Sequence, residues 1–188
     1  MRVIAGSARG TRLYGAKGYR IRPVLDRVKE SLFSALGDTV EGARVLDLFA
    51  GVGSLGIEAL SRGASHVDFI EQHRATVGSI SDNLDRACLG EKADAYVARL
   101  PRGLARASGR YSLIFIDPPF RIDRRLLESV FSSIKAKGLL DEGGLLLYRH
   151  SRYSRYEPDQ GEWQLEERRE YGDSVVSIFS TGEQESRI

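Results

Sequence analysis

The chain has 188 residues, of which 41% are hydrophobic and 29% are charged, and its formal net charge is +2. We predict one folded core rather than a disordered chain or a membrane protein, because no stretch approaches the ~18 consecutive apolar residues of a membrane span. The single cysteine, Cys88, excludes an intramolecular disulfide, and the three scattered histidines do not have zinc-ligand spacing. The sequence opens without an apolar signal segment. We therefore expect a cytoplasmic protein without a bound metal.

The basic residues are concentrated near the N-terminus. Residues 1–30 contain eight Lys and Arg residues against two acidic residues, whereas the other 158 residues contain 20 basic against 24 acidic residues. This asymmetry predicts a basic arm that contacts nucleic-acid phosphates, and an ordinary solvated surface is the alternative. We expect a basic N-terminal hairpin and helix in residues 1–40, followed by a second domain in residues 41–188.

The types of predicted element and their order differ along the chain. Two short apolar pieces around the sequence GSARG indicate a small hairpin, and apolar residues at helical spacing predict a helix over 21–37 with Asp26 as its N-cap. Strands and helices then alternate, and two strands without an intervening helix meet at Gly172. The strands are expected at 43–48, 66–73, 93–100, 111–120, 143–150 and in the two halves of 163–180. This order predicts an α/β fold, a Rossmann-like, doubly wound, mainly parallel seven-stranded sheet that ends in an antiparallel hairpin.

The loop after the first strand carries the first chemical motif. Gly51, Gly53 and Gly56 have G-x-G-x-x-G spacing, which lets the backbone turn sharply and approach a ligand at a helix N-terminus. Close packing of the strand against the helix is the alternative explanation for these glycines. Glu71, at the end of the second strand, is placed to accept hydrogen bonds from ribose hydroxyls. Together these residues predict a cofactor that contains adenosine.

Asp47 helps to choose the cofactor. A dinucleotide places its pyrophosphate at this loop, where a nearby carboxylate would repel it. S-adenosylmethionine has no phosphate and carries an ammonium and a sulfonium group, so it suits Asp47 better. The alternative is that Asp47 caps the following helix instead of facing the ligand.

A second motif, IDPPF, ends the fourth strand. The two prolines stiffen the turn, so that Asp117 and the carbonyl of Pro118 form a rigid pair of acceptors beside the ring of Phe120. This corner suits a planar base whose exocyclic amine donates to the acceptors while its face stacks on the ring. An ordinary turn after a strand is the alternative. The motif therefore predicts transfer of a methyl group to the amine of a base.

Five segments of the chain resemble the bacterial small-subunit (16S) rRNA guanine-N2 methyltransferases of the RsmD type, which are class I S-adenosylmethionine enzymes. The segments are RVIAGSARGTRL, RPVLDRVKESLF, VLDLFAGVGSLGIEALSRGA, IDPPF and YGDSVVSIF. The IDPPF motif alone is shared with other amine methyltransferases, whereas the second and third segments are more specific.

The resemblance implies roles for individual residues. The catalytic group would be Asp117, Pro118, Pro119 and Phe120. The cofactor would contact Asp47, Phe49, Ala50, Gly51, Gly53, Glu71, Gln72, Arg99, Leu100 and Asp117. RNA would contact Arg2, Arg9, Arg12, Lys17, Arg22 and Arg27.

The chain departs from the family pattern at several of its positions. Val24 and Leu25 replace two threonines, and His73 stands where the family often has aspartate. Arg99 stands where an Asp or Asn usually faces the adenine amine. Since a guanidinium cannot accept a hydrogen bond, adenine recognition would use backbone groups or stacking. The segment YRHSRYSRY replaces an acidic residue with basic and aromatic ones, and its tyrosines could either contact RNA or pack in the core.

We therefore expect an enzyme that methylates the exocyclic N2 amine of a guanine in 16S rRNA or in the assembling 30S subunit, using S-adenosylmethionine and acting as a monomer. Three alternatives remain open. They are an adenine-N6 or cytosine-N4 methyltransferase, a nicotinamide-dependent oxidoreductase with the same glycine loop, and a non-catalytic RNA-binding module. The small size argues against the first, and Asp47 argues against the second.

Overall fold

The structure is a computed structural model in which residues 1–15, 26–154 and 156–182 are described. Its centre is a seven-stranded sheet with the order β3-β2-β1-β4-β5-β7-β6. The strands are β1 (Arg44–Leu48), β2 (His66–Glu71), β3 (Ala93–Val97), β4 (Tyr111–Ile116), β5 (Leu140–Ser151), β6 (Trp163–Tyr171) and β7 (Ser174–Thr181). The helices are α1 (Asp26–Leu36), α2 (Ser54–Ser61), α3 (Arg74–Ala87) and α4 (Arg124–Ala136), with 3-10 turns η1 (Gly37–Val40), η2 (Gly90–Lys92) and η3 (Arg102–Ala105). The predicted α/β fold is confirmed.

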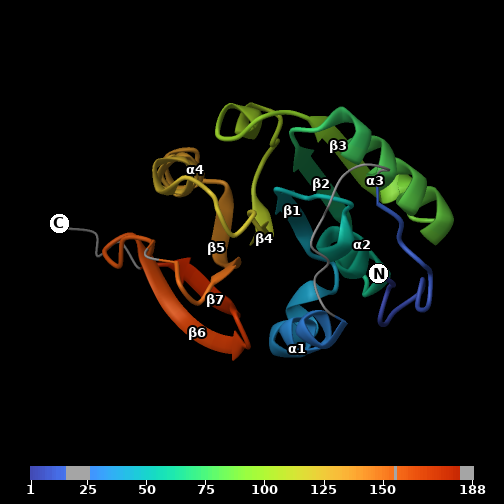
Figure 1. Ribbon diagram of the computed structural model, residues 1–188, viewed down its shortest axis with the longest axis horizontal. Coiled ribbons are helices and arrows are strands. Elements are labelled where there is room, and N and C mark those ends of the chain that lie inside the picture. The colour runs from blue at the N-terminus through green and yellow to red at the C-terminus, as the bar shows by residue number, and fades with distance from the viewer. Residues whose placement is uncertain (16–25, 155, 183–188) are drawn as a thin grey trace.

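The strands β3, β2, β1, β4 and β5 are parallel, and the central three, β2, β1 and β4, are buried on both faces. Successive residues of β1 alternate between two hydrophobic clusters: Val45 lies in the cluster with α1, α2 and α3, and Leu46 lies in the cluster with η3 and α4. Figure 1 shows α1, α2 and α3 on one side of the sheet and α4 on the other. Because both faces are covered, these strands have continuous apolar runs instead of alternating polar and apolar residues.

The last two strands close the sheet as an antiparallel hairpin. The chain turns at Gly172, whose φ of 58° favours glycine, and β7 returns between β5 and β6. The apolar residues of β7 pack into the sheet, whereas the outermost strand β6 exposes most of its charged residues to solvent. Charged residues on an edge strand oppose pairing with another chain.

The N-terminal segment lies against α2 and α3. It has a hairpin path, but its antiparallel pairing is a single bridge, Arg2 to Arg12, and not two regular strands. The backbone N–H groups of Ile4 and Ala5 donate to the buried carboxylate of Glu58 in α2, at 2.8 and 3.0 Å. Val3, Ala8 and Leu13 belong to the same hydrophobic cluster as α1, α2 and α3. The boundary at residue 40 stays a prediction, and hydrophobic contacts cross it.

Some predicted boundaries differ from the observed ones. The strand expected over 93–100 ends at Val97, because Leu100 and Leu104 turn back to pack on the second hydrophobic cluster. The strand expected from 143 begins at Leu140, with an irregular register between Tyr111 and Leu113 of β4. The beginning of the helix expected over 21–37 lies outside the described residues. Within those residues, the helices are too short and too polar to span a lipid bilayer.

Candidate active site

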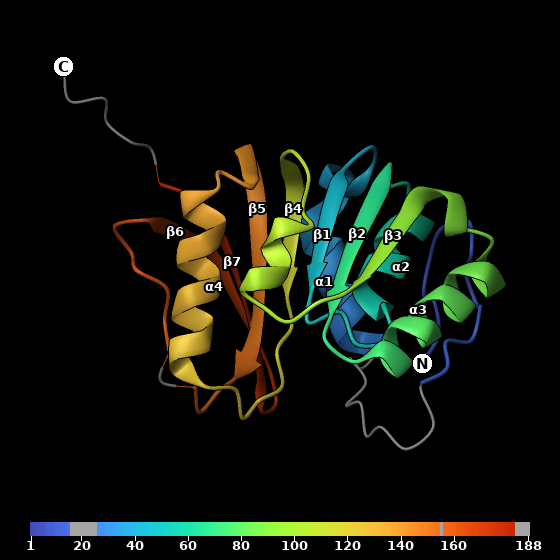
Figure 2. The ribbon, with the colours of Figure 1, turned by 90° about the horizontal axis from the view of Figure 1, so that it is seen from above.

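A cavity of about 420 Å³ lies at the carboxyl ends of β1, β2, β3 and β4. Figure 2 shows the N-terminus beside α3, at the same end of the molecule as the tip of the β5 arrow, and Met1 lines the cavity. Most of the residues predicted for the cofactor and for catalysis line this cavity. They are Phe49, Ala50, Gly51, Glu71, Gln72, Arg99, Leu100, Asp117, Pro118, Pro119 and Phe120. The structure therefore brings the loops after four strands together, as their positions at one edge of a parallel sheet predict.

The glycine loop after β1 is tightly wound. Phe49, Gly51 and Gly53 all have positive φ angles, of 57°, 57° and 78°. This conformation is strained for Phe49, and such strain is found most often at functional sites. A Cβ atom on Gly53 would lie only 3.2 Å from the side chains of Ile57 and Phe69. Gly53 therefore serves the turn and does not line the cavity.

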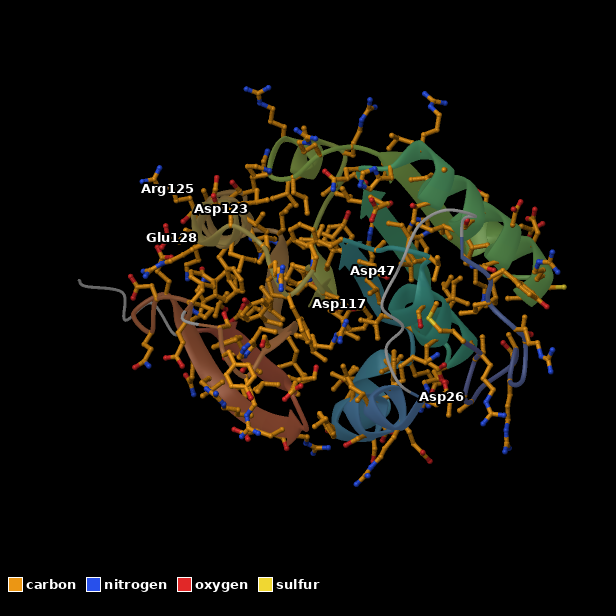
Figure 3. All side chains as sticks on the ribbon, viewed as in Figure 1. Asp26, Asp47, Asp117, Asp123, Arg125 and Glu128 are labelled. Atoms are coloured by element: carbon orange, nitrogen blue, oxygen red, sulfur yellow. The ribbon has the colours of Figure 1, made fainter. Side chains whose placement is uncertain are left out.

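Asp47 lies beneath the loop instead of lining the cavity. Its side chain is buried, and Oδ2 accepts a hydrogen bond from the backbone N–H of Gly56 at 3.0 Å. Gly56 is the third residue of α2, so the carboxylate caps that helix, which is the alternative left open by the sequence. Burial raises the pKa of Asp47 well above its ordinary value, and the nearby carboxylates of Asp117 and Glu71 raise it further. Figure 3 shows Asp47 and Asp117 side by side.

Glu71 ties the glycine loop to the end of β2. Its Oε2 accepts a hydrogen bond from the N–H of Gly51 at 3.1 Å, and its Oε1 accepts one from the N–H of His73 at 2.9 Å. The carboxylate thus fixes two backbone segments and also lines the cavity. Its orientation is set before any ligand binds.

Asp117 lies at the opposite wall of the cavity and is paired with a residue that the sequence did not single out. Arg149 in β5 places both Nε and Nη2 at 2.6 Å from Oδ1 of Asp117. The guanidinium also lies 5.4 Å from the centroid of the Phe120 ring. Burial raises the pKa of Asp117, and the charge and hydrogen bond of Arg149 oppose that rise.

Arg149 and Ser54 are two of the cavity residues that sequence reasoning missed. Arg149 was seen only as part of a basic segment, because its pairing with Asp117 depends on β4 and β5 being neighbours in the sheet. Ser54, the first residue of α2, lines the cavity, and within the described part of the chain its buried Oγ has no hydrogen-bond partner. Ser54 directly follows Gly53, the second glycine of the loop, and a hydroxyl at that position could have indicated a ligand-binding residue, since helix N-termini bind anionic groups.

The predicted RNA-contacting arginines are exposed at several points. Arg9, Arg12 and Arg27 are exposed, and Arg2 forms an ion pair with Asp26 at 3.0 Å. Lys17 and Arg22 lie outside the described residues, as do Val24 and Leu25. The site assignments for RNA remain predictions.

The three tyrosines of residues 148–156 differ in their exposure to solvent. Tyr148 and Tyr156 are buried, and their rings lie 5.4 and 5.6 Å from that of Phe131. Tyr153 is 76% exposed. The core interpretation therefore holds for Tyr148 and Tyr156, whereas Tyr153 faces solvent.

A second group of ligand-type side chains lies at the other end of β2. His66, Asp68 and Asp94 have potential ligand atoms within 4.8 Å of one another. Asp68 already accepts hydrogen bonds from Arg44 at 3.1 Å and from the hydroxyl of Tyr111 at 2.7 Å. The nearby guanidinium opposes a further cation, so the group joins four neighbouring strands as a polar cluster.

Known proteins resemble this chain over nearly its whole length. A family model described as "Conserved hypothetical protein 95" matches residues 1–180. "Putative rRNA methyltransferase YlbH" from Bacillus subtilis is 35% identical over 182 residues, covering 95% of this chain and 98% of the relative. "Ribosomal RNA small subunit methyltransferase D" from Escherichia coli K12 is 36% identical over 146 residues, covering 78% and 72%.

The fold has a similar match among solved structures. "Putative methyltransferase yhhF" from Escherichia coli has a TM-score of 0.86 and 32% identity, covering 98% of this chain and 99% of that one. The match extends over the cavity, the glycine loop and the final hairpin alike. The chain therefore belongs to the family described as conserved hypothetical protein 95, the family of ribosomal RNA small subunit methyltransferase D, as its motifs predict.

Proposed function

We propose that this rRNA methyltransferase transfers a methyl group from S-adenosylmethionine to the exocyclic N2 amine of a guanine in small-subunit rRNA. The observation that carries the proposal is the position of the Asp117, Pro118 and Phe120 corner, which opens into the same cavity as the glycine loop. A base held at this corner would therefore present its amine to a methyl donor held by the loop. The family relationship supports rRNA as the substrate class.

The residues of the cavity fit S-adenosylmethionine. Two carboxylates, Glu71 and Asp117, line the cavity, and their charge favours a ligand with ammonium and sulfonium groups over a pyrophosphate. The Ser54 hydroxyl at the start of α2, which has no hydrogen-bond partner among the described residues, suits a carboxylate group. Ile70 and Leu100 offer apolar surface to a purine, so Arg99 need not accept its amine. Bound here, S-adenosylmethionine would supply an electrophilic methyl group on its sulfonium.

The chain's own contribution is to orient the amine and exclude water. The amine of guanine is a weak nucleophile, because its lone pair is delocalised into the ring. Hydrogen bonds to Asp117 and to the carbonyl of Pro118 favour the geometry that the nitrogen adopts as the new N–C bond forms. S-adenosylmethionine bound beside the amine would supply the methyl group and leave as a neutral thioether, and the amine proton that the methyl group replaces would pass to solvent. No covalent intermediate with the protein is needed, so positioning accounts for the catalysis.

The N-terminal segment is proposed to contact the RNA. Its exposed Arg9 and Arg12 lie on the segment whose first residue, Met1, lines the cavity. Phosphate contacts there would hold an extruded guanine close to Asp117. Residues 1–40 would thus act as the RNA-contacting part and residues 41–188 as the cofactor-binding part.

Methyl transfer to defined substrates tests the proposal. Labelled S-adenosylmethionine should methylate naked 16S rRNA or 30S particles lacking the modification, with N2-methylguanine as the product by mass spectrometry. Asp117→Ala should lower turnover at least ~100-fold and leave the affinity for S-adenosylhomocysteine within about threefold, because the acceptor acts mainly on the amine. Transfer to duplex DNA alone, or normal turnover by Asp117→Ala, would contradict the proposal.

The cofactor has a separate test. A ligand that binds only the folded state raises the melting temperature. S-adenosylhomocysteine should raise the Tm of the protein, whereas NAD and NADP should not. Stabilisation by NAD or NADP alone would reject S-adenosylmethionine as the cofactor.

A further inference from the structure

The contact between Arg149 and Asp117 is asymmetric. Both Nε and Nη2 of Arg149 lie 2.6 Å from the same oxygen, Oδ1, and no hydrogen bond to Oδ2 is found in residues 1–15, 26–154 and 156–182. The two side chains are 11% and 15% exposed, so water screens the pair only weakly. Such a contact fixes the plane of the carboxylate and leaves Oδ2 able to accept another hydrogen bond.

Arg149 is itself held in place. It belongs to the part of β5 that pairs with β7, opposite Val176, and its guanidinium lies 5.4 Å from the Phe120 ring centroid. Arg149 and Phe120 both line the cavity beside Asp117. The arginine therefore joins the acceptor and the stacking ring of the proposed base-binding corner.

On the basis of the function proposed above, we propose that Arg149 is a positioning residue for methyl transfer. It holds Oδ1 of Asp117, keeps the buried carboxylate ionised, and presents Oδ2 to an N–H of the target amine. A protonated Asp117 would lose part of its capacity to accept from the amine, because its hydroxyl would become a donor. Arg149 itself takes no part in bond making or breaking.

Other charged groups face the same space. Asp47 lies beneath the loop, and Glu71, His73 and Arg99 line the cavity. Burial disfavours ionisation of Asp117, and the charge and hydrogen bond of Arg149 oppose that effect. His73 places an imidazole in the same cavity, so the experiment controls for it.

The test is the pH dependence of methyl transfer to rRNA by the full-length protein. Arg149→Gln should lower kcat about tenfold or more at neutral pH and shift the acidic limb upward by about one pH unit or more, because the compensating cation is lost. Arg149→Lys should keep the limb near that of the wild type while kcat falls, since a lysine keeps the charge but not the two-nitrogen contact. Affinity for S-adenosylhomocysteine should stay within about threefold in both variants.

Two controls accompany these variants. Arg152→Gln removes an exposed arginine three residues away, which pairs with Glu170 at 3.3 Å, and should leave the profile unchanged. The shift caused by Arg149→Gln should persist in a His73→Asn background, which excludes His73 as its origin.

The outcomes distinguish this inference from the proposed function. If the wild type transfers no methyl group to any RNA substrate, the proposed function fails and the role of Arg149 fails with it. If the wild type is active and Arg149→Gln has an unshifted profile, or is more active at every pH, only the positioning role is overturned. Higher activity of Arg149→Gln at every pH would mean that Arg149 obstructs the base-binding corner instead of orienting Asp117.

Discussion

At the scale of single residues, Asp47 serves the loop that surrounds the proposed ligand. Its buried carboxylate accepts the N–H of Gly56, so it takes the place of a side-chain cap at the start of α2. Without this acceptor, a backbone donor inside the protein would be left without a partner, which costs about 1–3 kcal/mol. The same carboxylate adds negative charge beneath the cavity.

Two substitutions separate these contributions. Asp47→Ala should lower the free energy of unfolding by about 1–3 kcal/mol, because Gly56 loses its acceptor. Asp47→Asn keeps an acceptor oxygen without the charge. Burial raises the pKa of Asp47 in the folded state above its value in the unfolded state. The protonated carboxyl therefore stabilises the fold at a pH below the unfolded-state pKa, and this stabilisation is lost as the pH rises through the folded-state pKa.

Asparagine resembles that protonated form at every pH. The stability of Asp47→Asn relative to the wild type should therefore increase between pH 5 and pH 8, as measured by urea unfolding at each pH. A difference that does not change with pH would show that Asp47 has the same protonation in the folded and the unfolded state over this range.

At the scale of elements, α2 packs unusually close to β2. A Cβ atom on Gly56 would lie 2.3 Å from Cε1 of Phe69 and 2.8 Å from Cγ1 of Val67, both of which are buried side chains. The absence of a side chain at Gly56 lets the helix approach the sheet and places its first turn below the cavity. This glycine therefore serves helix packing, which was the alternative interpretation of the motif.

The same substitution in two helices tests this interpretation. Gly56→Ala should destabilise the fold by about 1–3 kcal/mol through overpacking. Gly78→Ala, in the exposed middle of α3, meets nothing within 4 Å and should stabilise it by about 0.5–1 kcal/mol. Thermal or urea unfolding compares the two, and a loss of stability of the same size in both would refute close packing as the cause.

At the scale of the whole molecule, the N-terminal segment runs from Met1 at the cavity to Ser7 and Ala8, which bind Ser61 at the far end of α2, and Arg12 returns to pair with Arg2. Neutralising Arg9 and Arg12 together to Gln should weaken RNA binding and reduce the slope of log K against log salt by about 1.4, if each contacts one phosphate of single-stranded RNA. Arg110 and Lys137 are exposed at the amino ends of β4 and β5, at the edge of the sheet away from the cavity.

Those two residues provide a matched control. Arg110→Gln with Lys137→Gln removes the same charge and should leave the salt slope of RNA binding near that of the wild type. Equal slopes for both double variants would mean that the N-terminal arginines act through overall charge and not through phosphate contacts. Fluorescence anisotropy with a labelled rRNA fragment over 50–300 mM salt measures the slopes.

Much of the fold could be predicted because its signals are local. The apolar run of β4, the glycines after β1 and the turn at Gly172 each depend on residues close together in the chain. The positions of strand ends were less certain. The chain leaves β3 before Leu100, because Leu100 and Leu104 pack on a hydrophobic cluster that includes residues of α4 and β5. These two elements lie at least twenty residues further along the chain.

The sequence by itself determined the α/β order, the family and the set of residues around the cavity, since these follow from hydrophobic periodicity and from motifs a few residues long. Only the tertiary structure decided that Asp47 caps α2, that Arg149 binds Asp117, and that Tyr148 and Tyr156 belong to the core. Each of these facts joins segments between nine and 32 residues apart or depends on burial. Such contacts are set by which strands become neighbours and how closely helices approach the sheet, which no short stretch of sequence specifies.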